Sequence, residues 1–219
     1  MKVVCVSHLA KRLAILGVFI SLLTACFTNK AVVNEENERV IKVAKINVQL
    51  GMAYLENNNI QRAKQKLLLA LRQGPTLPET WFTMAYFLEA TGDKEQAGVY
   101  YLKAISVAPQ RGDAQNNYGT FLCRSGEYKA SVHHFMLAVK DPDYLDVAGA
   151  YENAGLCALK IPNKQLAKQY FQMAVRQDPK RSAQLMRLAN QSEEKPVIPH
   201  QPVGIVQGER HGVVRAAHT

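Results

Sequence analysis

The sequence predicts an all-α fold in which about four helix pairs and a capping helix repeat along the chain and stack into a superhelix. One observation is a period of 34 residues, which separates Pro75 from Pro109 and Ala70 from Ala104. A second is the Gly-Asp turn signal at 92–93, which falls midway between these prolines. A fixed period of this length is typical of solenoids built from helix pairs, so it decides the architecture before any local assignment.

Composition places the chain among globular proteins, with 47% hydrophobic and 21% charged residues in 219. The formal charge is +9; if Lys2, Lys11 and Arg12 are removed with a signal segment, 24 of the 27 basic residues remain against 18 acidic ones, a net charge of +6. The charges alternate in sign along predicted helices, as Glu56 and Arg62 do, instead of clustering. We therefore expect no nucleic-acid partner.

Residues 1–25 are predicted to be a signal peptide. Lys2, Lys11 and Arg12 precede an uncharged, apolar run at 13–23. This run is shorter than the roughly 20 residues that a helix needs to span a bilayer. The order of charge and hydrophobicity favours a secretory signal over a short buried helix.

The stretch Leu-Thr-Ala-Cys at 23–26 resembles the lipobox of bacterial lipoproteins. The resemblance implies that Cys26 is the lipidated first residue of the mature protein, held to the membrane by several acyl chains. Phe27, in place of an Asp, implies the outer membrane, with the protein domain facing the periplasm. Residues 26–40 are largely polar and are predicted to form a tether.

The period resembles the tetratricopeptide repeat, with a domain at 41–190. Small residues fall where the two helices of a pair approach closely; these are Gly51, Ala85, Gly119 and Gly155. Residues 191–219, rich in Pro, Gly and His, are predicted to be a disordered tail. The repeats are expected at about 44–77, 78–111, 112–145 and 148–181, with a capping helix at 182–190.

Two stretches are similar to a narrower family, the PilF/PilW lipoproteins of type IV pilus systems. They are 116–123 (NNYGTFLC) and 151–157 (YENAGLC), and the overall resemblance covers about residues 13 to 190. It implies an outer-membrane pilotin or stabilising factor whose partner is a secretin subunit. The family usually carries about six repeats, whereas here the pattern stops inside the fifth.

Four cysteines occur in the chain, and two of them remain for the folded domain. Cys5 lies in the signal peptide and Cys26 would carry lipid. Cys123 and Cys157 belong to first helices of neighbouring repeats, which run side by side, so their sulfurs can reach bonding distance. An oxidising compartment favours a disulfide, and the alternative is two buried thiols.

The inner side of such a stack, lined by the first helices, is the expected protein-binding surface. In the first two repeats its apolar residues predict an exposed patch that a partner covers, unless the tether or a neighbouring helix covers it. Asn117 and Asn153 are expected to hydrogen-bond an extended peptide. The cations of a carboxylate clamp are missing. The apolar set is Val48, Met52, Leu55, Phe82 and Tyr86.

No catalytic residue, metal site, cofactor or small-molecule substrate is predicted. His133 and His134 are adjacent on a helix, so their side chains should diverge by about 100°. The leading hypothesis is a secretin-binding scaffold for type IV pilus biogenesis. One alternative is a scaffold for a peptidoglycan hydrolase or an outer-membrane assembly factor. Another is a hydrolase hidden in the stack, with Cys123 as nucleophile and His133 as base.

Overall fold

The protein is described by a computed structural model, which covers residues 35–161, 164–181 and 187. The chain forms two compact units, Met1–Val43 and Ala44–Thr219. In the first unit the described residues are helical from residue 35, inside the segment predicted to be a tether. Arg39 forms an ion pair with Glu35 one turn earlier. Glutamate and arginine are good helix formers, and this i,i+4 pair supports the first turn.

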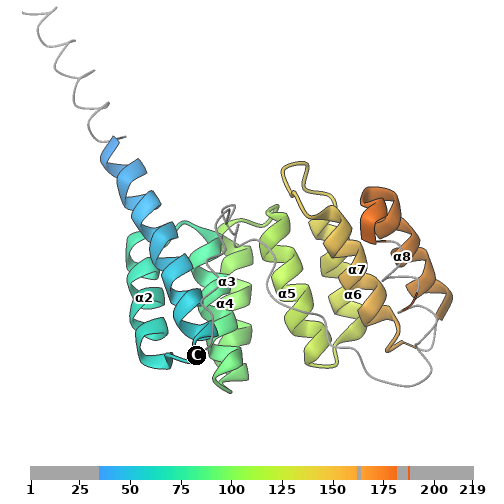
Figure 1. Ribbon diagram of the computed structural model, residues 1–219, viewed down its shortest axis with the longest axis horizontal. Helices are drawn as coiled ribbons and strands as arrows, with labels where there is room; N and C mark the ends of the chain where they lie inside the picture. Colours follow the sequence, from blue (N-terminus) through green and yellow to red (C-terminus); the bar gives the residue numbers. More distant parts are fainter. Residues whose placement is uncertain (1–34, 162–163, 182–186, 188–219) are drawn as a thin grey trace, which may run out of the picture. The chain divides into compact units, whose positions relative to one another are not determined.

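The described residues of the second unit form four helix pairs, and the predicted all-α fold is confirmed (Figure 1). The helix that begins at residue 35 ends at 56, so residues 44–56 supply the first member of the first pair. The described helices that follow are α2 (Ile60–Gln73), α3 (Pro78–Ala90), α4 (Lys94–Val107), α5 (Gly112–Arg124), α6 (Tyr128–Ala138), α7 (Val147–Ala158), α8 (Lys164–Gln177) and the short 3-10 helix η1 (Pro179–Arg181).

In each pair the two helices approach each other closely at a small residue, as the sequence predicted. A Cβ atom added to Gly51, Gly119 or Gly155 would lie 2.5 to 2.9 Å from a carbon of the opposite helix. That separation is too short for van der Waals contact, so a Cβ at these positions would push the opposing side chain away. The opposing side chains are Leu67, Phe135 and Phe171, respectively. In the second pair Ala85 takes the same place and is fully buried.

The turns inside the first three pairs share one geometry. Each contains a left-handed residue, with φ of 56° at Asn58, 95° at Gly92 and 88° at Gly126. After α3, the Asp93 N–H donates to the Leu88 carbonyl at 2.9 Å, which ends the helix in a Schellman motif. Glycine adopts this conformation without strain, and asparagine tolerates it better than other residues.

Side-chain caps begin several of the helices. Each cap oxygen accepts a hydrogen bond from a backbone N–H in the first turn, a group that has no partner within the helix. The caps are Asn59 to the Arg62 N–H (3.2 Å), Asp93 to the Gln96 N–H (3.2 Å) and Asp146 to the Gly149 N–H (3.0 Å).

The core is divided into clusters that lie between neighbouring repeats. One joins Leu67 of the first pair to Phe87 of the second, and another joins Tyr101 of the second to Phe121 of the third. A further cluster joins Phe135 of the third pair to residues of α7 and α8. Each pair therefore depends on its neighbours for burial of its apolar side chains.

Several predicted segments lie outside the described residues: the signal peptide, Cys26, the tail, and all of the capping helix except Arg187. Among the helices that are described, none combines the length and the apolar character needed to cross a membrane.

Candidate protein-interaction face

The first helices of the pairs lie next to one another. α3 contacts α5, and α5 contacts α7. We use the term inner face for the side chains of residues 44–56, α3, α5 and α7 that were predicted to line the binding surface. All seven predicted binding residues belong to these helices.

The apolar part of the inner face is largely covered. Val48, Met52 and Phe82 are 4%, 6% and 0% exposed, so the predicted exposed patch is wrong at these positions. Phe82 packs with Ala85 and Tyr101 in the core between the second and third pairs. The hydrophobic effect accounts for the difference, since these side chains gain burial within the folded chain itself.

Two of the predicted apolar residues remain accessible. Leu55 and Tyr86 are half-buried; each rests on a core cluster and leaves part of its surface open. Tyrosine combines an apolar ring with a polar tip, which suits it to a surface that a partner covers. These two residues are therefore the apolar contacts that the inner face offers.

The two predicted asparagines are buried and have different hydrogen-bond partners. Asn153 of α7 donates through Nδ2 to Oδ1 of Asn116 on α5, at 3.1 Å. Asn117 donates to the backbone carbonyl of Asp113 in its own helix, at 2.8 Å. The amide groups thus stabilise the stack rather than forming a ladder along an open groove. The prediction missed Asn116, although it stands directly before Asn117 in the sequence.

An ion pair bridges the first helices of the second and third pairs. Arg124 binds Glu89 through Nε and Nη2, and Tyr101 Oη donates to the same carboxylate at 3.2 Å. Burial raises the pKa of Tyr101 well above its ordinary value, and the negative charge of Glu89 raises it further. Burial alone would lower the pKa of Arg124, but the hydrogen bonds and charge of Glu89 outweigh it, and the pKa is raised. This ion pair was not predicted from the sequence.

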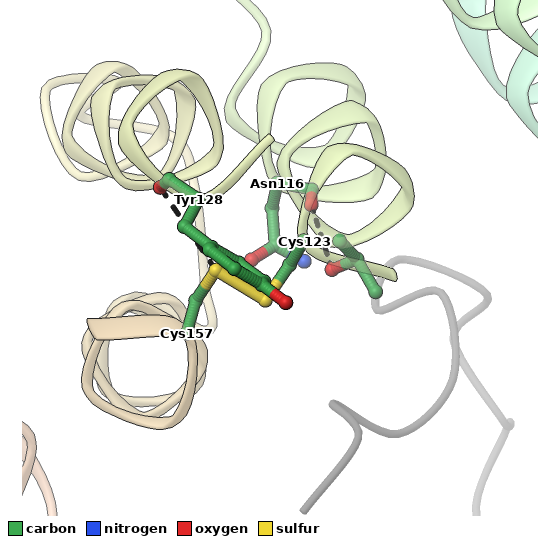
Figure 2. Close-up of a disulfide and its surroundings, with 5 residues drawn as sticks. Asn116, Cys123, Tyr128 and Cys157 are labelled. Atoms are coloured by element: carbon green, nitrogen blue, oxygen red, sulfur yellow. Dashed lines mark hydrogen bonds between the residues drawn. A yellow bond between two sulfur atoms is a disulfide. The ribbon is translucent and has the colours of Figure 1, made fainter. Parts of the chain in front are cut away.

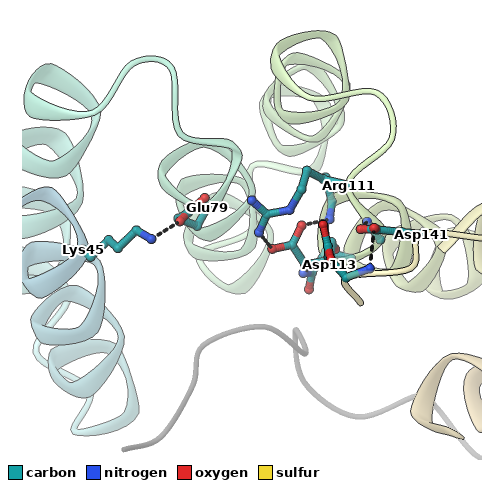
Figure 3. A network of polar contacts seen from close by, with 9 residues as sticks. Lys45, Glu79, Arg111, Asp113 and Asp141 are labelled. Carbon is teal, nitrogen blue, oxygen red and sulfur yellow. Dashed lines mark hydrogen bonds and ion pairs between the residues drawn. The ribbon is translucent and has the colours of Figure 1, made fainter. Parts of the chain in front are cut away.

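One edge of the inner face carries two more ion pairs, shown in Figure 3. Lys45 lies 3.3 Å from Glu79, and Arg111 pairs with Asp113. The cation side chains are 54% and 47% exposed, whereas the carboxylates are 14% and 11% exposed. Asp141 accepts a hydrogen bond from the Gly112 N–H at 2.7 Å. This edge therefore presents ammonium and guanidinium groups to solvent.

The structure contains the Cys123–Cys157 disulfide, one of the two states that the sequence left open. The two Cα atoms are 5.8 Å apart. Figure 2 shows the bridge between α5 and α7, with Asn116 and Tyr128 beside it. The disulfide thus connects the third pair to the fourth across their first helices.

The remaining titratable candidates on α6 are His133 and His134. The rings of His133 and His134 are 5.6 Å apart, edge to face. His134 Nδ1 lies 2.7 Å from Gln115 Oε1, and burial, with the charge of His133, lowers the pKa of His134. With Cys123 oxidised, the proposed Cys–His nucleophile lacks its thiolate. No group of three metal-binding side chains occurs among the described residues.

Comparison with known sequences gives three similarities. A family model for the tetratricopeptide repeat matches residues 78–111, which contain α3 and α4. An uncharacterized protein of Haemophilus influenzae is 32% identical over 139 residues, 64% of this chain and 78% of that protein. The type IV pilus assembly protein PilF of Pseudomonas aeruginosa is 29% identical over 129 residues, 59% of this chain and 51% of PilF. The chain thus matches about half the length of PilF.

Comparison with solved structures gives similarities over a longer region. The structure of Pseudomonas aeruginosa pilF superposes with a TM-score of 0.60 at 25% identity and covers 69% of this chain and 73% of that one. The crystal structure of PilW, a widely conserved type IV pilus biogenesis factor, superposes with a TM-score of 0.60 at 28% identity, covering 68% and 71%. Both similarities concern several successive helix pairs rather than a single repeat.

Proposed function

Because this chain belongs to the tetratricopeptide repeat proteins homologous to the type IV pilus biogenesis factors PilF and PilW, we propose that it serves pilus biogenesis as a non-catalytic, protein-binding scaffold. The observation that carries the proposal is the agreement of sequence and fold over most of the helix stack. Function resides in surfaces rather than in folds, so the inner face is where the proposal is tested.

The proposed partner is a secretin subunit of the pilus system. Leu55 and Tyr86 provide half-buried apolar contacts, and the edge at Lys45 and Arg111 provides exposed cations. A surface of this kind suits a segment with apolar anchors and flanking carboxylates. Glu89 and Arg124, at the C-terminal ends of α3 and α5, already neutralise each other, which leaves the apolar contacts to supply most of the affinity.

The proposed location is the outer membrane, with the helix stack in the periplasm. Its support is the lipobox-like stretch at 23–26, which would place acyl chains on Cys26 a few residues before the helix that begins at 35. Fractionation of a Cys26→Ser variant tests the anchor. We expect the wild-type protein in the outer-membrane fraction and the variant in the soluble periplasmic fraction. Recovery of both in the same fraction would refute the lipid anchor.

The partner is tested by pull-down and by complementation. In a strain that lacks the gene, the full chain should restore surface pili, and its capture from solubilised membranes should recover secretin. The variant Leu55→Glu with Tyr86→Glu should lose both. Leu102→Glu on α4 is the matched control, since Leu102 is 52% exposed and lies on a second helix; it should behave as wild type. Circular dichroism checks that all variants are folded.

Other outcomes identify the alternative partners. If the deletion strain keeps normal pili and instead shows defective septation or a permeable envelope, the pilus proposal fails. The scaffold would then serve a peptidoglycan hydrolase or an outer-membrane assembly factor. If the wild-type protein recovers no secretin while pili are lost on deletion, the role in biogenesis stands and the secretin as partner is wrong.

A further inference from the structure

Both sulfur atoms of the disulfide are enclosed by the folded chain. Cys157 is 0% exposed and Cys123 is 6% exposed. They belong to the core cluster that contains Phe135 of α6, Leu156 of α7 and Phe171 of α8. A thiol or disulfide reagent therefore has no open approach to the bond in the closed stack.

Forming this bond requires such an approach. One cysteine thiolate must attack a sulfur of an oxidised disulfide, protein-borne or small, which releases one thiolate of the oxidant and leaves a mixed disulfide. The second cysteine thiolate then attacks the sulfur of the first cysteine and releases the other oxidant thiolate. The two cysteine thiols lose two protons and two electrons, and the oxidant becomes a dithiol. The first step needs a cysteine sulfur that the oxidant can reach, and the second needs room for the oxidant while it is still attached.

The element whose movement would expose the sulfurs is the fourth helix pair. α7 and α8 pack against each other, and α7 also packs against α6 and α5. The connection from α6 to α7 spans residues 139–146. The Asn153–Asn116 hydrogen bond also holds α7 to α5. The sulfurs lie in the core cluster that joins the third and fourth pairs, so separation of α7 and α8 from α5 and α6 would expose them.

We propose that α7 and α8 open from the rest of the stack as one unit, and that the Cys123–Cys157 bond is formed and reduced in that open state. The oxidant, a disulfide reagent or a dithiol oxidase, acts on the chain before the fourth pair closes. After closure the bond resists reductants. This inference rests on the disulfide and its burial, and is independent of the pilus partner.

The first test is the rate of reduction. The folded protein and the protein unfolded in urea are treated with dithiothreitol at one pH, and free thiols are trapped with a maleimide that shifts the band on a gel. We expect reduction of the folded protein to be at least 100-fold slower. Equal rates would show that a sulfur is accessible in the closed stack, and would overturn the proposal.

A matched pair of variants shows whether opening is local. Asn153→Ala removes the hydrogen bond to Asn116, and Asn47→Ala removes the equally buried amide that donates to Gln73 at 2.8 Å in the first pair. We expect Asn153→Ala to speed reduction at least fivefold and Asn47→Ala to change it less than twofold. Equal acceleration by both would mean that the whole stack unfolds, and no acceleration by either would mean that α7 does not move. Both results contradict the proposal.

Hydrogen exchange on the wild-type protein gives a readout that needs no variant. The backbone amides of α7 and α8 should exchange together, and reduction should speed their exchange while the amides of α3 and α4 keep theirs. Exchange of α8 alone, or a uniform change across the four pairs, would rule out a fourth pair that opens as a unit.

Discussion

Arg124 on α5 binds Glu89 on α3 through two hydrogen bonds, Nε to Oε1 at 2.7 Å and Nη2 to Oε2 at 2.6 Å. The pair joins helices whose residues are 35 positions apart in the chain. Since the two side chains are 20% and 11% exposed, the interaction is shielded from solvent and from salt. It therefore holds the second and third pairs in one register.

Loss of the carboxylate should destabilise the fold more than loss of the whole pair. Glu89→Ala leaves the guanidinium without this partner, and we expect the free energy of unfolding to fall by about 3 kcal/mol. The double variant Glu89→Met with Arg124→Leu should lose less, because no charge is left partly buried. Urea denaturation of the three proteins measures both values. A double variant less stable than Glu89→Ala would contradict this account.

The left-handed turn residue of the first pair offers a stabilising change. Asn58 has a φ of 56°, where glycine is favoured, so Asn58→Gly should raise the unfolding free energy by up to about 1 kcal/mol. Gly92→Ala, at a φ of 95°, should lower it by about 1 to 2 kcal/mol. Gly98→Ala is the control, because Gly98 lies within α4 and a Cβ added there would come no closer than 3.5 Å to another side chain. Alanine at this position should raise the unfolding free energy slightly. Thermal unfolding distinguishes the three.

Removal of the disulfide should cost stability without changing the fold. The bond closes a loop with a sequence separation of 34, and on the chain-entropy model this contributes roughly 3 to 4 kcal/mol. Cys123→Ala with Cys157→Ala should therefore shift the urea midpoint down while keeping the helical circular dichroism spectrum. Reductant should lower the stability of the wild-type protein and leave the variant unchanged. A variant as stable as wild type would show that the disulfide does not stabilise the fold.

The stability of the protein should fall as pH drops below about 6.5, the ordinary pKa of histidine. Burial, with the charge of His133, lowers the pKa of His134 in the folded state. Between that lowered pKa and 6.5, the unfolded chain binds more protons than the folded one, which favours unfolding. His134→Gln should flatten the dependence between pH 5 and 7, measured by urea titration, while His133→Gln should largely retain it. An unchanged slope in His134→Gln would contradict this assignment.

The contacts inside each helix pair followed from the sequence because they repeat with the period. Gly51, Gly119 and Gly155 were identified by their spacing, and each proves to be a point of close approach. The turn at Gly92 was predicted from local residue types, which is sufficient because turn conformation is a local property.

The contacts between pairs were harder to predict. Val48 and Met52 are buried, and no period in the sequence specifies what covers a given position in the folded chain. Asn153 meets Asn116, not Asn117, and the period does not specify which of these two adjacent amides faces α7. The Glu89–Arg124 ion pair depends on how the first helices of successive pairs are placed. Side-chain identity alone does not reveal which of several nearby charged side chains will form an ion pair.

The shared turn geometry makes the second repeat a modular unit. The second repeat begins at Pro78, turns at the left-handed Gly92 and ends before Gly112. These boundaries are the ones that the third repeat requires of the repeat before it. A duplicate of residues 78–111 inserted after 111 would meet a surface that already packs against this repeat, so the array can be lengthened there by a whole unit. The longer connection at 139–146 breaks this equivalence. A whole repeat can therefore be added before the connection at 139–146, whereas the fourth pair after it is specific to this junction.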